Sequence, residues 1–273
     1  MAFNYKPYIR EDKFPNIWCP GCGIGILMKA IIRAVHKMGW KREDVALVSG
    51  IGCTSRMPGY VNFNTLHTTH GRALAFATGI KHARPDKHVI VVSGDGDALA
   101  IGGNHFIHAC RRNIDITLIV LNNMIYGMTG GQVSPTTPAG YRASTMPYGN
   151  VEPNFDTVNL AIGAGATYVA RSTVNNPALM ERQIKEGLQN KGFSVIEVVS
   201  NCHIQFGRRN KMGDQLVLRH WIKEREVPLR KAKDMSPEEL EGKFVIGTFV
   251  KKTRPEYTEE YAKMVERVKG ASK

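Results

Sequence analysis

Apolar positions follow two different patterns along the first 200 residues. Five short runs rich in Val, Ile and Leu are apolar without interruption, at residues 44–49, 88–93, 114–121, 166–171 and 193–199. Such runs are typical of strands buried on both faces of a parallel sheet. Between them, apolar side chains recur at helical spacing over residues 24–38, 70–83 and 176–189. This alternation predicts an α/β protein with right-handed βαβ units and a mostly parallel, doubly wound sheet.

The pattern weakens after residue 202. The segment Ser236-Pro237-Glu238-Glu239 has the form of a capping box with Pro at the first helical position. Residues 258–269 then place Tyr261, Met264, Val265 and Val268 on one helical face. We therefore expect a main domain over residues 1–202 and a C-terminal extension over 203–273 that packs on the core or on a partner subunit.

Two polar motifs follow two of the predicted strands. Gly94-Asp95-Gly96 comes directly after the run 88–93, and Asn122-Asn123 ends the run 114–121. Both motifs are expected at the carboxyl ends of neighbouring parallel strands, where open α/β sheets bind ligands. Glycines at 94 and 96 allow the backbone to approach a diphosphate, and a helix that starts near Ala98 would point its N-terminus at it.

The same two motifs supply oxygen ligands for a cation. Asp95 offers a carboxylate oxygen, Asn123 an amide oxygen and Ile125 a main-chain carbonyl, which together suit Mg²⁺. The motif pair resembles the signature of thiamine-diphosphate enzymes. The longer stretches GDGDALAIGGNH and NNMIYGMTGGQVSPT resemble the β subunits of 2-oxoacid:ferredoxin oxidoreductases. The resemblance extends over roughly residues 15–210.

The resemblance implies a set of residues around thiamine diphosphate. The histidine of His70-Gly71-Arg72 is expected to contact the diphosphate and to take part in catalysis. The residues expected to line the cofactor are Ile51, Gly52, Cys53, Thr54, His70, Gly94, Asp95, Gly96, Asp97, Gly127 and Met128.

Five cysteines, an odd number, argue for metal-binding or catalytic thiols and against a disulfide framework. Cys19 and Cys22 form a CxxC on a Pro/Gly turn, whereas Cys53 and Cys202 follow predicted strands. On these spacings alone, a zinc site, a redox pair and a [4Fe–4S] cluster all remain open. The family resemblance implies the cluster, with Cys19, Cys22, Cys53 and Cys202 as its ligands, and leaves Cys110 as a buried apolar residue.

The resemblance also implies an activity and partners. The family decarboxylates a 2-oxoacid, transfers the acyl group to coenzyme A and passes the electrons to ferredoxin. An α subunit supplies the Glu that acts on the cofactor, so the expected assembly is an αβ heterodimer or its dimer. Two alternatives are an enzyme for pyruvate or a branched-chain 2-oxoacid, and a non-redox thiamine-diphosphate carboligase or decarboxylase.

Arg56 bears on the choice of substrate. It lies three residues after Cys53, and its guanidinium can bind a carboxylate through two hydrogen bonds. The far carboxylate of 2-oxoglutarate would pair with it, whereas pyruvate has no such group. A basic residue at this position also resembles the family members that use 2-oxoglutarate. We therefore expect Arg56 in the catalytic site and 2-oxoglutarate as substrate, with succinyl-CoA as product or the reverse carboxylation.

Net charge and the absence of long apolar segments limit the kinds of partner that we expect. The net charge of +13 can attract nucleic acid, anionic substrates or an acidic protein, but we find no nucleic-acid-binding motif. A +13 chain favours an acidic ferredoxin. The first 17 residues lack the apolar segment of a signal peptide, and no apolar run approaches the ~18 residues of a membrane span. We expect a cytoplasmic protein that binds neither membranes nor nucleic acid.

Overall fold

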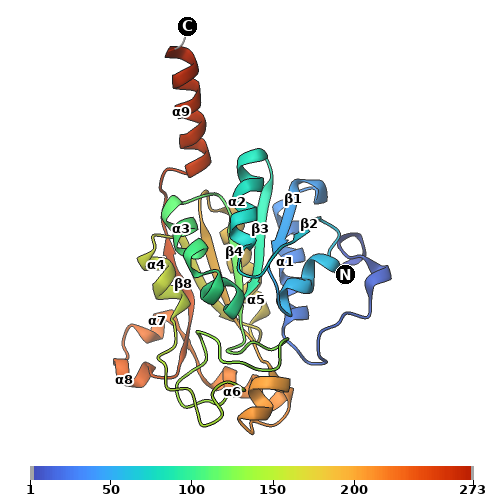
Figure 1. Cartoon of the computed structure of the whole chain (residues 1–273), viewed down its shortest axis with the longest axis vertical. Coiled ribbons are helices and arrows are strands. Elements are labelled where there is room, and N and C mark those ends of the chain that lie inside the picture. Colours follow the sequence, from blue (N-terminus) through green and yellow to red (C-terminus); the bar gives the residue numbers. More distant parts are fainter. Residues whose placement is uncertain (1–2, 272–273) are drawn as a thin grey trace.

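The computed structural model describes residues 3–271 and centres on one eight-stranded sheet (Figure 1). Its strands run in the order β2-β1-β3-β4-β6-β5-β8-β7. Their bounds are β1 Val45–Ser49, β2 Asn64–His67, β3 His88–Gly94, β4 Thr117–Asn122, β5 Tyr168–Thr173, β6 Ser194–Val199, β7 Glu226–Pro228 and β8 Phe244–Lys251. Each neighbouring pair is parallel except β5 and β8. The predicted mostly parallel sheet is confirmed.

Helices cover both faces of this sheet. One face carries α1 (Ile24–Met38) and α5 (Pro177–Gln189), and the other carries α2 (Ala73–Ala83), α3 (Gly103–Arg112) and α4 (Thr157–Gly163). Successive strand residues point to opposite faces. In β1, Leu47 belongs to the core under α1, whereas Val48 belongs to the core under α2. Because both faces are covered, the strands are apolar without interruption, as the sequence indicated.

Local chemistry sets where the predicted elements start. Helix α1 has the predicted bounds, but α2 begins only at Ala73 because Gly71 takes a left-handed φ of 68°. Strand β4 begins at Thr117, three residues later than predicted, after Asn113 ends α3 with a φ of 55°. The edge strands β2 and β7 and the strand β8 were not predicted.

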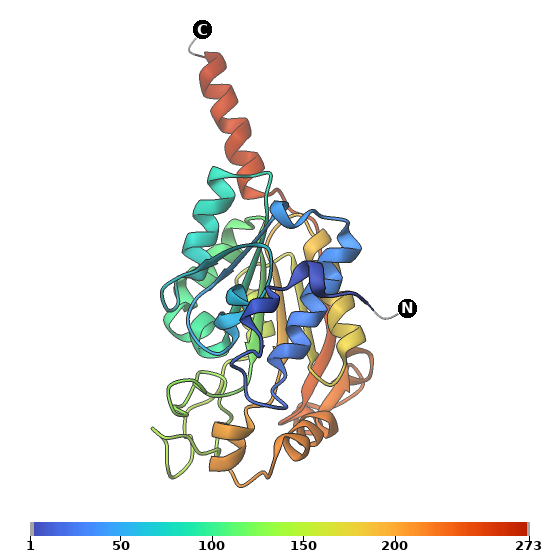
Figure 2. The same cartoon turned by 90° about the vertical axis from the view of Figure 1, so that its right-hand side faces the viewer.

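The segment after residue 202 adds a strand to the core sheet. It contains α6 (Gln215–Glu224), α7 (Leu229–Ala232), α8 (Pro237–Leu240) and α9 (Tyr257–Ala271), and β8 pairs antiparallel with β5. The expected capping box at Ser236 is present. Helix α9 projects away from the sheet, at the end opposite to α6 (Figures 1 and 2). Residues 203–273 are thus tied to the main domain through β8, as far as residue 271.

Short helical turns complete the chain. The 3-10 turns are Lys6–Tyr8, Glu11–Lys13, Arg42–Asp44 and Thr54–Gly59, and the π-helical turns are Gly96–Ile101 and His203–Gly207. Three of these turns follow the carboxyl ends of β1, β3 and β6. The long loop 123–156 follows β4 at the same edge, in the lower part of Figure 1. The polar motifs therefore meet at one edge of the sheet.

Candidate active site

Asp95 is a buried carboxylate held from one side by hydroxyl groups. It follows β3 and is 2% exposed. Ser134 and Thr136, from the loop after β4, donate hydrogen bonds to its Oδ2 at 2.5 and 2.7 Å. Burial raises the pKa of Asp95 above its ordinary value, although both hydroxyls act against this. A buried carboxylate in such surroundings favours a bound cation as counter-charge.

The other oxygen of Asp95 faces Asn123 and Ile125. In one amide orientation the Asn123 nitrogen donates to Asp95 Oδ1 at 3.3 Å and to the Ile125 carbonyl at 2.7 Å. In the other orientation, three oxygens face one another at the same distances. Adjacent ligands of an octahedral Mg²⁺ lie about 2.9 Å apart, given metal–oxygen distances of about 2.0–2.1 Å. The nitrogen-inward orientation satisfies the metal-free protein, whereas the oxygen-inward orientation would present the three expected ligands to a bound cation.

Asp97 has a different role from Asp95. Its Oδ1 accepts hydrogen bonds from His70 Nδ1 at 2.6 Å, Gly71 N at 2.7 Å and Ile51 N at 3.1 Å. Its Oδ2 accepts a hydrogen bond from the Ser93 hydroxyl. The carboxylate is thus surrounded by donors of its own chain. It fixes the turn after β1 and orients the imidazole of His70, which leaves Nε2 as the ring nitrogen available to a ligand.

These residues line one cavity of about 100 Å³. Its lining contains every residue expected at thiamine diphosphate and all three expected magnesium ligands. Tyr126 and Thr129 line it as well and were not predicted. Tyr126 donates to the Gly96 carbonyl at 3.0 Å, and a Cβ at Gly96 would lie 2.3 Å from its ring. Glycine at 96 is therefore required by close packing against this tyrosine.

Four cysteines from three distant parts of the chain surround a second cavity. Cys19, Cys22, Cys53 and Cys202 line a space of about 280 Å³. A Cβ at Gly127 would lie 3.2 Å from Cys202 Sγ and 3.9 Å from Cys53 Sγ, so the glycine leaves room beside the sulfurs. The two cavities share Cys53, Asn123, Gly127 and Met128 in their walls.

The four thiols are the kind of donor that holds an iron–sulfur cluster. Within residues 3–271, no three His, Cys, Asp or Glu side chains converge closely enough to hold one metal ion. A cubane cluster is bound differently, because each thiolate takes a separate iron at a corner. Burial and the neighbouring thiols raise the pKa of Cys22 to about 12 and that of Cys53 to about 11. Such thiols ionise at neutral pH only when a metal displaces the proton.

Comparison with known proteins agrees with this geometry. Residues 50–198 match the family model described as thiamine pyrophosphate enzyme, C-terminal TPP binding domain. The chain is 56% identical over 262 residues to the 2-oxoglutarate synthase subunit KorB of Methanocaldococcus jannaschii, covering 96% of this chain and 97% of that protein. It is 51% identical to the KorB subunit of Archaeoglobus fulgidus, covering 97% and 95%.

A solved structure is also similar over nearly the whole length. The 2-oxoglutarate:ferredoxin oxidoreductase from Magnetococcus marinus, with 2-oxoglutarate, coenzyme A and succinyl-CoA bound, is 34% identical and has a TM-score of 0.87. The match covers 97% of this chain and 91% of that one. The chain belongs to the β-subunit family of 2-oxoacid:ferredoxin oxidoreductases. The thiamine-diphosphate-binding fold that the sequence predicted is therefore confirmed.

Cys110 and Arg56 both lie outside the two site cavities, but Cys110 is buried and Arg56 is exposed. Cys110 is fully buried in α3, away from the cavity of the other four cysteines, and burial raises the pKa of its thiol. Arg56 lies in the turn Thr54–Gly59 and is exposed. It is absent from the linings of both site cavities, and it forms no side-chain ion pair within residues 3–271.

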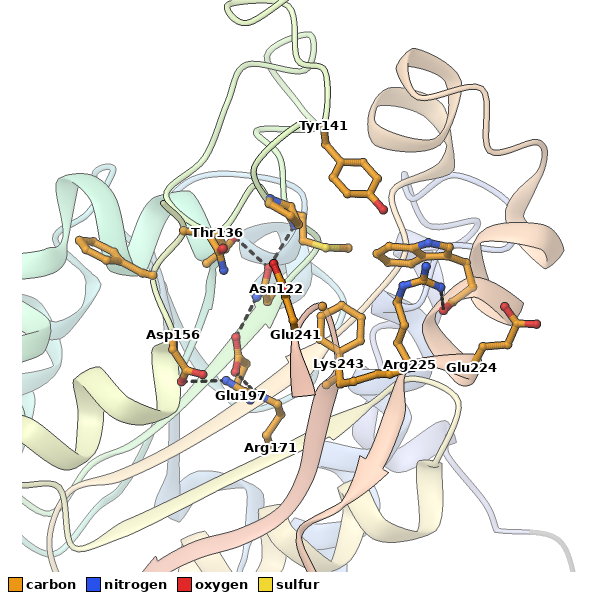
Figure 3. A pocket seen from close by; sticks show the side chains of 17 residues that line it. Asn122, Thr136, Tyr141, Asp156, Arg171, Glu197, Glu224, Arg225, Glu241 and Lys243 are labelled. Carbon is orange, nitrogen blue, oxygen red and sulfur yellow. Dashed lines mark hydrogen bonds and ion pairs between the residues drawn. The ribbon is translucent and has the colours of Figure 1, made fainter. Parts of the chain in front are cut away.

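A third cavity of about 500 Å³ lies between the main domain and the C-terminal extension, with Asn122 and Thr136 in its wall (Figure 3). Thr136 Oγ1 lies within hydrogen-bond distance of both Asp95 and Asn122. Asn122 donates to Glu197 at 2.8 Å, and Glu197 pairs with the buried Arg171. The sequence singled out Asn122 but not Arg171 and Glu197, because these two occur singly within apolar strands. Part of the signal was Ser134-Pro135-Thr136, which ends the second stretch that resembles the family.

The described helices also bear on membrane association. Of the helices within residues 3–271, none combines the length and apolar character that would be needed to cross a bilayer.

Proposed function

We propose that the chain is the β subunit of a 2-oxoglutarate:ferredoxin oxidoreductase. The complex would decarboxylate 2-oxoglutarate oxidatively with coenzyme A to succinyl-CoA and CO₂, or run the reverse reaction. The observation that carries the proposal is the wall shared by the Asp95 cavity and the four-cysteine cavity. A thiamine enzyme without redox chemistry needs no cluster beside its cofactor. The names of the similar proteins support the same activity.

Asp95, Asn123 and the Ile125 carbonyl are proposed to hold Mg²⁺ against the diphosphate. Thiamine diphosphate, when bound, supplies the carbanion chemistry that cleaves a 2-oxoacid. The protein supplies position and electrostatics. Ser134 and Thr136 hold Asp95, and Asp97 keeps the proton on His70 Nδ1. His70 Nε2 is then the nitrogen that faces the diphosphate or the substrate.

Cys19, Cys22, Cys53 and Cys202 are proposed as the four ligands of a [4Fe–4S] cluster. Three of these thiols are half-buried and would be partly shielded from solvent, and Cys19 is exposed at the surface. Because the cavities share a wall, electrons from the oxoacid need travel only a short distance to the cluster. Ferredoxin is the proposed acceptor.

The described part of the chain does not complete the active site. Within residues 3–271, Asp95 and Asp97 are the only carboxylates that line the cofactor cavity, and hydrogen bonds from this chain engage both. An acid that acts on the cofactor ring must therefore come from a partner. We propose an α subunit in this role, in an αβ heterodimer or its dimer.

Arg56 remains the proposed residue for substrate selectivity. It lies two residues from Thr54, which lines the cofactor cavity, and its exposed guanidinium is free to meet a carboxylate once the α subunit covers the site. Replacing Arg56 by Ile should raise the Michaelis constant for 2-oxoglutarate far more than that for pyruvate. If the wild-type enzyme prefers pyruvate, or if the substitution raises the Michaelis constants for both substrates equally, Arg56 has no such role.

The activity is tested on the complex purified anaerobically with its α subunit. Iron and acid-labile sulfide should each approach four per β subunit, the content of one such cluster. The complex should reduce methyl viologen with 2-oxoglutarate and coenzyme A, and much more slowly with pyruvate or branched-chain 2-oxoacids. An iron-free complex that releases CO₂ without reducing viologen would instead identify a non-redox thiamine enzyme.

A further inference from the structure

An apolar surface adjoins the cysteine cavity. Ile17, Met128 and Ile204 line this cavity and are 65%, 47% and 37% exposed. The start of α6 continues the surface, because a Cβ at Gly21, inside the CxxC turn, would lie 2.4 Å from Gln215 Cγ. The next residue, Leu216, is 66% exposed. Exposed apolar groups gathered at a functional site indicate a docking surface.

Positive charge borders this apolar surface. Residues 203–225 contain six Lys and Arg against two Asp and Glu. Among them, Arg208 and Lys211 are exposed, and neither side chain has a hydrogen bond or ion pair within residues 3–271. Both belong to the turn that follows Cys202: Gly207 N donates to the Cys202 carbonyl at 3.0 Å, and Met212 N donates to the Gly207 carbonyl at 2.9 Å.

The nearby acidic groups do not cancel this charge. Asp214 accepts from the backbone amides of Leu216 and Val217 and so caps α6. Glu224, the other acid of residues 203–225, lies 3.1 Å from His220 Nε2. Figures 1 and 2 both place α6 at the end of the molecule opposite to α9. Arg208 and Lys211 therefore add uncompensated positive charge to the segment that joins Cys202 to α6.

We propose that this carrier face, made of Ile17, Ile204, Leu216, Arg208 and Lys211, docks an acidic one-electron carrier protein of the ferredoxin type. This rests on the proposed function and identifies the part of the chain that receives the carrier. A second copy of this basic chain would be repelled, whereas an acidic carrier is steered toward the face. Oxidation of one 2-oxoacid releases two electrons, so two oxidised carriers dock in turn and each leaves reduced by one electron.

The test uses the complete αβ complex with Arg208→Glu/Lys211→Glu. A matched control, Lys41→Glu/Arg267→Glu, makes the same charge change on exposed residues near the opposite end of the sheet. The Michaelis constant for an acidic [4Fe–4S] ferredoxin at low salt should rise about tenfold in the carrier-face variant and stay near wild type in the control. Its dissociation constant, measured by calorimetric titration without substrate, should rise similarly.

Further measurements separate the explanations. High salt should remove most of the difference, because screening shortens to about 3 Å at 1 M. Leu216→Ser should weaken ferredoxin binding without this salt dependence. Iron content and methyl viologen reduction should be unchanged in each variant. Unaltered ferredoxin binding in the carrier-face variant would overturn the proposal, and so would loss of the α subunit, which would make the face a subunit contact. Absence of viologen reduction in wild type would instead refute the proposed function.

Discussion

Asp95 and Asp97 allow one substitution to be tested at two buried carboxylates with opposite expected outcomes. The two are 2% and 3% exposed and lie two residues apart after β3. Four donors surround Asp97, whereas Oδ1 of Asp95 lies 3.3 Å from the side-chain amide of Asn123, which can present either its nitrogen or its oxygen. Replacement of each by Asn keeps the shape of the side chain and removes its charge. The effect on stability should therefore depend on the neighbours alone.

Asp95→Asn should stabilise the protein when cofactor and metal are absent. Its amide oxygen can accept from Ser134 and Thr136, while its amide nitrogen can donate to the side-chain oxygen of Asn123, 3.3 Å away, once that amide turns its oxygen inward. The substitution also removes a buried charge whose pKa is raised by burial. We expect a gain of about 1 kcal/mol, or roughly 2–4 °C in Tm for a chain of this size. Affinity for Mg²⁺ and thiamine diphosphate should fall more than about a hundredfold.

Asp97→Asn should destabilise the same cofactor-free protein. Four donors lose a charged acceptor, among them the amide of Ile51 and the imidazole of His70. Hydrogen bonds to charged groups contribute about 1.5–3 kcal/mol each and neutral ones about 0.5–1.5 kcal/mol, so the expected loss is about 2–4 kcal/mol.

The assay is thermal unfolding of the chelator-treated complex, followed by titration with Mg²⁺ and thiamine diphosphate. Wild type should gain the most stability from the cofactor, and Asp95→Asn almost none. The reasoning would be refuted if both variants shifted the cofactor-free transition in the same direction. It would also be refuted if Asp95→Asn retained wild-type cofactor affinity.

Three further expectations concern other parts of the molecule. Cys→Ser at 19, 22, 53 or 202 should each lower iron content and stop electron transfer, whereas Cys110→Ser should leave both intact; iron loss only in the last variant would exclude the ligand set. Gly96→Ala should reduce thiamine-diphosphate binding, measured as retained cofactor, since its Cβ would lie 2.3 Å from the Tyr126 ring. Burial acts to raise the pKa of Glu181, but Lys37 and Arg33 hold it below its ordinary value, so Glu181→Gln should cost about 1 kcal/mol at neutral pH. In urea unfolding, that cost should disappear as the pH falls through the lowered pKa, and a cost that persists in acid would contradict this.

Much of the fold could be predicted because its strands are buried on both faces. Uninterrupted apolar runs identified β1, β3, β4, β5 and β6. The edge strand β2 has largely exposed residues and β7 is only three residues long, so neither has a comparable pattern. Strand β8 lies in the weakly patterned extension and is mostly half-buried. Its pairing with β5 brings together residues about 80 positions apart, which local periodicity does not encode.

The sequence could predict which residues form the site but not which role each of them has. The glycines, Asp95 and Asn123 are recognisable because their spacing follows two strands. The sequence assigned Asp95 to the metal as well as the cofactor, and it placed Asp97 only among the residues that line the cofactor. The structure separates them, because the donors to Asp97 come from three different segments, after β1, before α2 and within β3. Arg56, expected in the site, is exposed, and only the assembled complex determines what it meets.

The backbone between Asn123 and Ile125 has a strained conformation that contacts from Asn122 and the loop after β4 hold in place. Met124 has a φ of 63°, a left-handed conformation that is costly for a residue with a side chain, about 1 kcal/mol or more. This turn brings the Asn123 amide and the Ile125 carbonyl toward one point. Two contacts hold it: Asn122 Oδ1 accepts from the Met124 amide at 3.1 Å, and Thr137 donates to the Met124 carbonyl at 2.6 Å.

The same stretch of loop supplies the hydroxyls that hold Asp95. Ser134 and Thr136 bind its Oδ2, and Asn150 in turn donates to the Thr137 carbonyl at 2.8 Å. One segment therefore fixes both halves of the proposed magnesium site, the carboxylate after β3 and the strained turn after β4. A strained backbone conformation persists only where several surrounding contacts hold it in place. We therefore expect that loosening residues 134–137 would weaken the proposed metal site, although Ile125, the nearest proposed ligand in sequence, lies nine residues before Ser134.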